Sequence, residues 1–331
     1  MPKAADESQM TLIESAQVSS VDPSALMRVA EAVRATGYRF VTITPASHAI
    51  VNARPRNSKA RMLECALGWS RPFSPAVMPE RLFGLMLEAD LLERKGSHWR
   101  SKVRFSTMNG DLFMHSAFPT TERDAVFFGP DTYKFVDAIR SWLAGHPSVV
   151  HRAADVCAGA GPGGVTIAKA LPDAEVLMLD INFKAVKFAA VNAAVAGCIN
   201  AIAVGSDLFS NAPGCFDLIV AHPPYLIDEG DRAYRHGGGD LGTGLALRIL
   251  KSSIERLSTK GTLLLFTGVA IVEGRDPFKA AASKVLDAAG VAWTYREADP
   301  DVFGEELARE VYQAADRIAL VVLTASKKAP V

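Results

Sequence analysis

The second half of the chain alternates short apolar runs with segments of helical periodicity. Such runs are typical of strands buried on both faces, and the helical segments between them supply the crossovers. Strands are expected at residues 149–156 and 174–179, and a third strand is expected to run into the segment 204–209. Further strands are expected at 216–225, 261–272, 292–297 and 317–324, and helices at 164–171, 245–257 and 277–290. This alternation predicts an α/β sandwich with a largely parallel sheet.

The first part of the chain follows another pattern. Residues 1–20 are polar, so we expect a disordered tail. Helices followed by an Asn-Gly hairpin favour a winged-helix-like module. The helices are expected at residues 24–37, 60–67 and 79–94, with Gly96 as a stop, and the hairpin strands at 99–106 and 111–116, around a Met108-Asn109-Gly110 turn.

The length of the chain favours two domains. It has 331 residues, and the α/β part takes up only about 200 of them, so a separate amino-terminal domain is expected. The boundary is expected near residues 118–131. We therefore predict a smaller domain at residues 21–125 and the α/β domain at 126–331.

A glycine-rich segment, DVCAGAGPGG at residues 155–164, lies between the first of these strands and the helix that follows it. Gly159 and Gly161 can take positive φ and let a ligand approach the backbone, while the free N–H groups of the helix start favour an electronegative group. Asp180 ends the second strand, at the spacing expected of a carboxylate that binds ribose hydroxyls. A nucleoside or nucleotide site is therefore expected.

The fourth strand runs into His222-Pro223-Pro224-Tyr225, and Asp207 follows the third strand. With these motifs the chain resembles the class I S-adenosylmethionine-dependent methyltransferases. It is most similar to the branch with an Asn-Pro-Pro-Tyr/Phe motif, which includes the release-factor glutamine methyltransferases and the "methyltransferase small" domain. The resemblance covers about residues 125–330 and implies a Rossmann-like, doubly wound sheet of seven mostly parallel strands with an antiparallel last strand. It makes residues 126–331 the methyltransferase domain and 21–125 a substrate-recognition domain.

The resemblance implies a role for each motif residue. Asp155, Gly159 and Gly161 would lie beside the methionine part of S-adenosylmethionine, Asp180 would bind its ribose, and Asp207 would accept a hydrogen bond from the adenine amino group. The other candidate cofactor-binding residues are Cys157, where the loop needs a small side chain, Phe209, which suits the adenine face or the core, and Thr132 in the segment FFGPDTY at residues 127–133.

The HPPY motif supplies the candidate catalytic residues, His222, Pro223, Pro224 and Tyr225. In the family, the Asn oxygen and the first Pro carbonyl accept the two N–H hydrogens of a planar nitrogen, and the aromatic ring stacks on it. His222 departs from that pattern, and a neutral imidazole offers one acceptor and one donor. Two functional hypotheses follow: His222 accepts one N–H of an amino substrate, or it acts as a general base on a nucleophile that must lose a proton. The alternative is that the imidazole only packs.

Residues 226–244 after the motif are polar and glycine-rich, which is typical of a substrate lid, although a plain solvated loop stays an alternative. Its candidate substrate-binding residues are Tyr234, Arg235 and His236, with Arg232 beside them.

The chain has a formal net charge of zero, but residues 54–104 carry eleven Lys or Arg against five Asp or Glu. Contact with nucleic-acid phosphates and a substrate-recognition or structural role both stay open for this segment. The four cysteines lack the spacing of a zinc site, so no metal is expected. The amino terminus lacks the apolar core of a signal peptide, and no apolar stretch could span a bilayer. We expect a soluble cytoplasmic protein without membrane contact.

Three hypotheses for the function follow. The first is an N-methyltransferase that acts on a protein glutamine amide, or alternatively on a nucleobase amino group or a small molecule. The second is a nicotinamide-dependent oxidoreductase, which shares the glycine loop and Asp180 but gives no reason for Asp207 or the HPPY motif. The third is a non-catalytic module that binds S-adenosylmethionine. The substrate partner is left undecided between protein, nucleic acid and small molecule, and the oligomeric state is not predicted.

Overall fold

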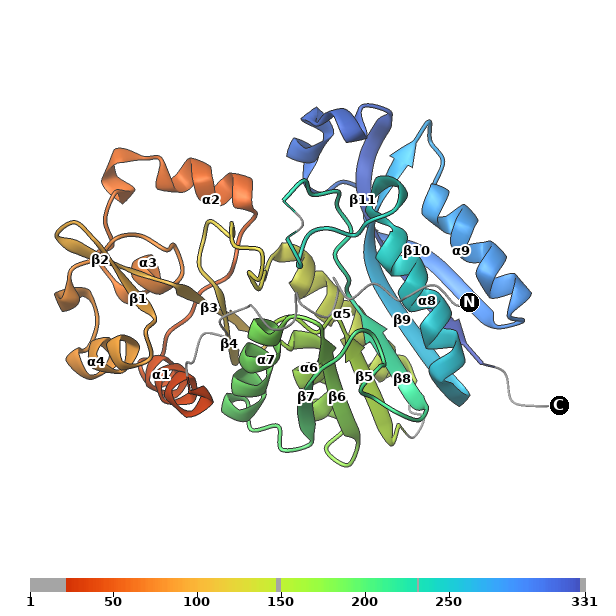
Figure 1. Cartoon of the computed structure of the whole chain (residues 1–331), viewed down its shortest axis with the longest axis horizontal. Helices are drawn as coiled ribbons and strands as arrows, with labels where there is room; N and C mark the ends of the chain where they lie inside the picture. Colours follow the sequence, from red (N-terminus) through yellow and green to blue (C-terminus); the bar gives the residue numbers. More distant parts are fainter. Residues whose placement is uncertain (1–21, 147–149, 231, 328–331) are drawn as a thin grey trace, which may run out of the picture.

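The computed structural model describes residues 22–146, 150–230 and 232–327. Its main element is a seven-stranded sheet with the order β10-β11-β9-β8-β5-β6-β7, in which β11 runs antiparallel to both of its neighbours (Figure 1). The strands are β5 (Arg152–Val156), β6 (Glu175–Asp180), β7 (Ala201–Gly205), β8 (Phe216–Ala221), β9 (Leu257–Val272), β10 (Ala292–Asp299) and β11 (Ala315–Ser326). The predicted doubly wound sheet with an antiparallel last strand is therefore confirmed.

Helices cover both faces of this sheet. Successive side chains of a strand point to opposite faces, so Ala153 and Met178 pack in one core while Ala154 and Leu177 pack in the other. The first core includes side chains of α5 (Pro130–Gly145), α6 (Pro162–Ala170) and α7 (Phe183–Val195), and the second those of α8 (Gly244–Arg256) and α9 (Pro277–Ala288). Burial on both faces explains why the strands are apolar runs rather than alternating ones.

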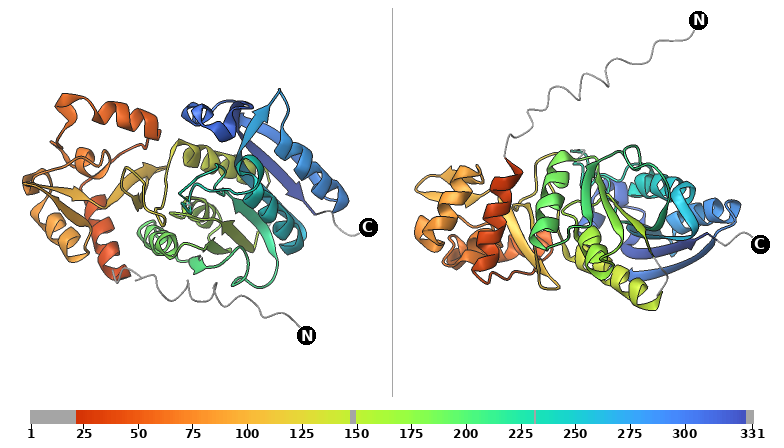
Figure 2. Two further views of the ribbon diagram at one scale, coloured as in Figure 1. Left: turned by 45° about the horizontal axis from the view of Figure 1, so that its top comes forward. Right: turned by 90° about the horizontal axis from the view of Figure 1, so that it is seen from below.

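The amino-terminal part lies beside the sheet in every view (Figure 2). Its buried side chains belong to the same continuous core as one face of the sheet. It contains α1 (Pro23–Ala35), α2 (Pro45–Asn52), α3 (Leu63–Leu67), α4 (Glu80–Glu88), and two two-stranded sheets formed by β1 (Leu92–Lys95) with β2 (His98–Ser101) and β3 (Val103–Met108) with β4 (Asp111–Ser116). The expected tail at residues 1–20 lies outside the described residues, and the boundary at residue 125 stays a prediction.

Three details of this part differ from the sequence expectations. The helix expected at residues 79–94 ends at Glu88, because the chain reverses at Asp90 (φ 49°) and Leu92 enters β1. The run at residues 99–106 is divided between β2 and β3. The helix α2 was not predicted. Tertiary pairing overrode the helical periodicity in the first case.

The expected Asn-Gly hairpin forms between β3 and β4, with Asn109 and Gly110 both at positive φ (54° and 88°), as a two-residue hairpin turn requires. The hairpin packs against α7 instead of projecting as a wing. The side chain of Asn192 on α7 accepts from the N–H of Met114 (2.8 Å) and donates to the carbonyls of Met114 (3.0 Å) and Ala160 (2.8 Å). One buried amide therefore joins the hairpin, α7 and the glycine-rich loop.

No helix among the described residues is long and apolar enough to cross a membrane.

Because Asn192 is fully buried, Asn192→Ala should leave two backbone groups of Met114 and the carbonyl of Ala160 without partners. We expect a loss of about 2–4 kcal/mol in the free energy of unfolding, measured by urea denaturation. The matched control is Asn211→Ala, since the exposed Asn211 makes one side-chain hydrogen bond, to the carbonyl of Gly205 (2.6 Å). That variant should lose less than about 1 kcal/mol. Equal losses in the two variants would contradict the role of Asn192.

Candidate active site

The carboxyl ends of β5, β6 and β8 meet at one edge of the sheet, where a cavity of about 830 Å³ opens between them and the start of α5. Parallel α/β sheets bind ligands at this edge. The sequence-predicted residues that line this first cavity are Thr132, Cys157, Gly159, Asp180, His222, Pro223, Pro224, Tyr225 and Tyr234. The fold therefore brings most of the predicted site residues together.

The glycine-rich loop is held by Asp180 at the end of β6. One oxygen of its carboxylate accepts from the N–H of Gly159 (2.8 Å) and the other from the N–H of Asn182 (2.9 Å). Burial raises the pKa of Asp180, and these two hydrogen bonds oppose that rise. Gly161 has φ 81° and caps the amino end of α6, outside the lining of the cavity.

Asp155 lies beneath the loop and not on the cavity surface. Its Oδ2 accepts from the N–H of Gly164 (2.7 Å), and its buried Oδ1 has no hydrogen-bond partner. Burial raises the pKa of Asp155 to about 7, the Gly164 N–H lowers it, and the charge of Asp180 raises it further. An orphaned buried carboxylate oxygen beside the loop fits a cationic ligand such as S-adenosylmethionine.

Two glycines of the loop that the sequence interpretation did not use are required by packing. A Cβ at Gly163 would lie 2.7 Å from Oδ2 of Asp155, and a Cβ at Gly164 would overlap the side chain of Met178. These positions let α6 pack directly on β5 and β6. The only signal in the sequence was the glycine pair itself, which does not reveal the residues it approaches.

Two predicted cofactor residues lie outside the lining of the first cavity. The side chain of Asp207 is 57% exposed and its Oδ1 is 3.5 Å from Nη2 of Arg248. Phe209 is buried in the core beside the ring of Phe216, with a centroid distance of 5.7 Å, and the guanidinium of Arg256 lies over its ring. Their proposed contacts with adenine stay predictions.

The HPPY motif follows β8 directly, and its aromatic residue is fixed on several sides. The hydroxyl of Tyr225 donates to Oδ2 of Asp131 (2.9 Å), and the ring lies against Gly268, where any Cβ would overlap it. Gly237 and Gly242 approach the backbone carbonyls of Pro224 and Tyr225 so closely that neither could carry a side chain. Glycines of the segment 226–244 therefore let its backbone pack closely against the backbone of the HPPY motif.

His222 sits in an aromatic enclosure on the cavity wall. Its ring centroid is 5.0 Å from that of Phe266, 5.3 Å from that of Phe135 and 5.8 Å from that of Tyr225. Burial lowers the pKa of His222, and the charge of Asp131 opposes this effect. The imidazole is therefore neutral at pH 7.

Asp131 is a site residue that the sequence interpretation missed, although it named the neighbouring Thr132. Asp131 is buried at the start of α5, and its Oδ2 is 3.5 Å from Nε2 of His222. The hydroxyl of Thr132 accepts from the N–H of Gly129 (3.2 Å) and so caps α5. The Pro-Asp-Thr segment was the available signal, but nothing in its residues shows that it lies beside the HPPY motif.

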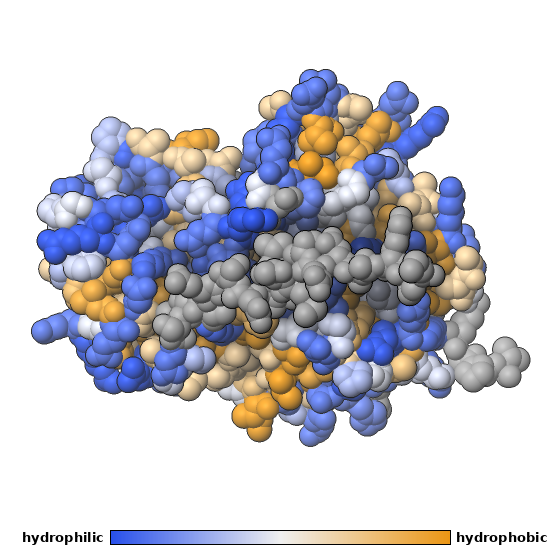
Figure 3. Space-filling view, in the orientation of Figure 1, coloured by the Kyte–Doolittle hydropathy of each residue, from blue (hydrophilic) through white to orange (hydrophobic). Residues whose placement is uncertain are grey.

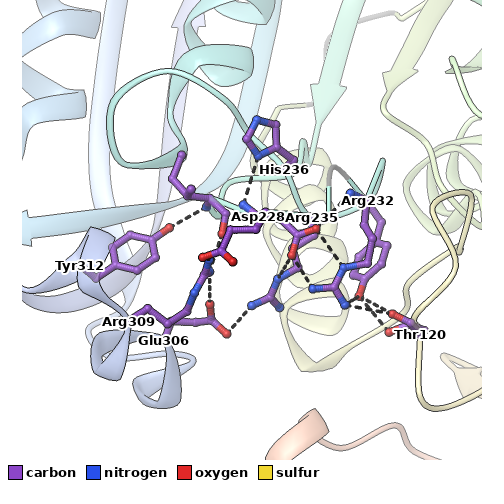
Figure 4. Close-up of polar contacts among 11 residues, drawn as sticks. Thr120, Asp228, Arg232, Arg235, His236, Glu306, Arg309 and Tyr312 are labelled. Carbon is purple, nitrogen blue, oxygen red and sulfur yellow. Dashed lines mark hydrogen bonds and ion pairs between the residues drawn. The ribbon is translucent and has the colours of Figure 1, made fainter.

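The segment 226–244, which we call the lid, is folded back on itself and held by ion pairs (Figure 4). The buried Asp228 carboxylate accepts from the side chain of Arg232 and pairs with Nε of Arg235 (3.2 Å). The hydrogen bonds from Arg232 lower the pKa of Asp228 to about 2. Arg235 also pairs with Glu306, between β10 and β11. Arg235 is thus paired within the protein, and its expected role in gripping substrate stays a prediction.

The other two predicted lid residues differ in their positions. The hydroxyl of Tyr234 hydrogen-bonds with the backbone carbonyl of Thr120 (3.0 Å), and its ring stacks on Phe127 at a centroid distance of 5.3 Å. His236 accepts from the N–H of Asp228 at Nδ1 (3.1 Å) and lines neither this cavity nor the neighbouring one.

The neighbouring, second cavity is a groove of about 690 Å³ that shares Phe127, Asp131, Tyr225 and Tyr234 with the first. It lies between α2 and the segment after β10, where the surface is hollowed in the upper part of Figure 3. Its other walls are mainly apolar and come from distant parts of the chain, including Pro45, Phe118, Pro119 and Phe303. Tyr225 and Asp131 form the junction of the two cavities.

Comparisons with known proteins agree with this site. Residues 143–271 match the family model of the methyltransferase small domain. Three curated relatives are ribosomal protein uL3 glutamine methyltransferases. That of Neisseria gonorrhoeae is 33% identical over 156 residues (44% of this chain, 50% of the relative), that of Bordetella pertussis 35% over 205 residues (58% and 66%), and that of Xanthomonas campestris pv. campestris 35% over 138 residues (38% and 44%).

Residues 143–271 therefore form a methyltransferase small domain of the S-adenosylmethionine-dependent methyltransferases, as the motifs predicted. This domain decides against a nicotinamide-dependent oxidoreductase. The chain spans about half the length of the first curated relatives it matches. Within the described residues, no cluster of His, Cys, Asp and Glu could hold a metal ion.

Asp180→Asn should weaken binding of S-adenosylmethionine and of its demethylated product by on the order of 10- to 100-fold, because a charge-assisted hydrogen bond contributes about 1.5–3 kcal/mol. Isothermal calorimetry measures both affinities. The control is Asp173→Asn, whose exposed side chain lies before β6 and outside the cavity lining, and it should change either affinity less than about threefold. If Asp180→Asn bound both ligands as well as the parent, Asp180 would not be part of the site.

Proposed function

We propose that this protein transfers a methyl group from S-adenosylmethionine to the side-chain amide nitrogen of a glutamine in a protein. The observation that carries the proposal is the presence of the HPPY motif and the glycine-rich loop in one cavity. The names of the curated relatives support the same class of acceptor, and ribosomal protein uL3 is the first candidate substrate.

S-adenosylmethionine would supply an electrophilic methyl group on its sulfonium. The loop residue Gly159 and the carboxylate of Asp180 would hold this cofactor, and Asp155 would support the loop from below through its hydrogen bond with the N–H of Gly164. The protein's main task is then to orient the acceptor nitrogen, because methyl transfer is an in-line displacement.

The HPPY motif suits that task. An amide nitrogen is a poor nucleophile, since its lone pair is delocalised into the carbonyl. The carbonyl of Pro223 and a ring nitrogen of neutral His222 would accept the two N–H hydrogens, which aims the nitrogen and draws electron density onto it. The ring of Tyr225, fixed by Asp131 and Gly268, would stack on the amide plane. Proline at two successive positions stiffens the turn.

The second cavity supports a polypeptide acceptor. Its walls are mainly apolar, and the nearby cations of Arg232 and Arg235 are already paired with Asp228 and Glu306. A groove without unpaired cations favours a neutral chain over a phosphate backbone. The amino-terminal part contributes Pro45 and Phe118 to this groove, in agreement with the proposed substrate-recognition domain at residues 21–125. A cytoplasmic location fits a ribosomal acceptor and stays a prediction.

A second candidate function follows from His222 itself. With a histidine in place of the family's Asn, the same site could methylate a nucleobase nitrogen or a small-molecule nitrogen or hydroxyl that must lose a proton, with His222 as general base. The enclosure of His222 keeps it neutral, which a base requires.

The proposal is tested by incubating the purified protein with methyl-labelled S-adenosylmethionine and an extract of cells that lack its gene. Label in a glutamine of uL3, identified by mass spectrometry of the digested protein, is the expected result. Label in RNA or in a metabolite would overturn the glutamine acceptor. Binding of S-adenosylmethionine without any labelled product would favour the non-catalytic module.

His222→Asn separates the two candidate functions. If His222 is a hydrogen-bond acceptor, the variant should keep or raise kcat, because an Asn oxygen accepts without depending on protonation. If His222 is a general base, kcat should fall by on the order of 100-fold or more. In both cases the parent should lose activity only as the pH drops below about 6.5, since burial lowers the pKa of His222. In the acceptor case, the variant should not show this acid-side loss.

A further inference from the structure

Because His222 stands where the family has Asn, the position of its imidazole proton decides which ring nitrogen can accept a hydrogen bond. In Asn the acceptor is Oδ1, which is bonded to Cγ. In His222 the atom at the same distance along the side chain is Nδ1, also bonded to Cγ. A neutral imidazole carries one proton, and only the nitrogen without it can accept a hydrogen bond. His222 can replace the Asn only if its proton lies on Nε2.

The surroundings of His222 select that tautomer. Nε2 is 3.5 Å from Oδ2 of Asp131, an oxygen that can only accept when the carboxyl is ionised. Among residues 22–146, 150–230 and 232–327, the structure gives Nδ1 of His222 no hydrogen-bond partner. The rings of Phe135, Phe266 and Tyr225 enclose the imidazole and offer its nitrogens no alternative polar group apart from the Tyr225 hydroxyl.

Asp131 is itself held in place. Its Oδ1 accepts from the N–H of Thr132 (3.0 Å), and its Oδ2 accepts from the hydroxyl of Tyr225 (2.9 Å). It stands in the first turn of α5, where the helix dipole favours a negative charge. Because the Tyr225 hydroxyl already donates to Asp131, the hydrogen left to complete the contact with His222 is the one on Nε2. Catalytic hydrogen bonds are often long before the substrate binds, so 3.5 Å is compatible with this contact.

We propose that Asp131 is a positioning residue: its carboxylate keeps the His222 proton on Nε2 and so leaves Nδ1 as the acceptor for an N–H of the substrate. The proposal rests on the function proposed above and adds to it the group that makes a histidine workable at the Asn position. Asp131 does not touch the reacting atoms and acts through His222.

The decisive variant is Asp131→Asn. Its Oδ1 can still accept from the N–H of Thr132, which turns the NH₂ group toward His222 and Tyr225. An NH₂ group donates to Nε2, which moves the imidazole proton to Nδ1 and removes the acceptor. We expect kcat for the labelled-methyl reaction to fall by on the order of 100-fold, because the substrate N–H would meet a donor where the parent has an acceptor and would be left without a partner. Calorimetry with S-adenosylmethionine confirms that the variant is folded.

A structural role for Asp131 would also lower kcat, so a double-mutant cycle is needed. An Asn at position 222 needs no tautomer control. In the His222→Asn background, Asp131→Asn should therefore reduce kcat less than about threefold. A loss of equal size in both backgrounds would overturn the proposal and leave Asp131 as a support for Tyr225.

Nitrogen-15 NMR of the His222 ring gives a readout that needs no substrate. With S-adenosylhomocysteine bound, the parent should show the proton on Nε2, and Asp131→Asn should show it on Nδ1. A proton on Nδ1 in the parent would overturn the proposal. This measurement tests the role of Asp131 even if the His222→Asn variant has no activity. Its result does not depend on which acceptor the labelling experiment finds, so the proposed glutamine acceptor and the proposed role of Asp131 can fail separately.

Discussion

The parallel alignment of β5, β6 and β8 is the constraint on which the rest of this structure depends. Parallel strands bring their carboxyl ends to one edge, so three segments separated along the chain reach one cavity. The loop after β5 has positive φ at Cys157, Gly159 and Gly161, which turns the chain so that the Gly159 N–H reaches the end of β6. The carboxylate of Asp180 then spans from β6 to the loop. If the three strands did not end at one edge, these groups could not contact the same ligand.

A second constraint is the close approach of backbone to side chain around the HPPY motif. Tyr225 occupies the space that a side chain on Gly268 would need. Gly237 and Gly242 pack on the backbone carbonyls of Pro224 and Tyr225. This packing fixes the backbone of the motif, and the hydrogen bond from the Tyr225 hydroxyl to Asp131 fixes its aromatic ring. Groups held in place before the substrate binds are the condition for electrostatic preorganisation of a site.

The sequence predicts the sheet and the cavity well because both follow from local patterns. Apolar runs mark strands, and a polar residue at a strand's carboxyl end belongs to the binding edge, as Asp180 and His222 do. The contacts of Asp131 with His222, of Arg235 with Glu306 and of Tyr234 with Thr120 could not be predicted, because periodicity reports burial and not the partner. Arg235 is an example. From the sequence alone, this arginine suits an anionic substrate, but in the structure its guanidinium is paired with Asp228 and Glu306.

The Asn-to-His difference also has a consequence for which residues can vary independently. An Asn at position 222 would offer its oxygen to a substrate whatever lies at position 131, whereas a His does so only if a neighbour accepts from Nε2. Asp131 is shared, since its Oδ2 also accepts from Tyr225. A change at Tyr225 therefore alters both the ring that would stack on the acceptor and the hydrogen bonding that positions His222. Under this proposal the start of α5 and the HPPY motif act as one functional unit, although Asp131 and His222 lie 91 positions apart in the sequence.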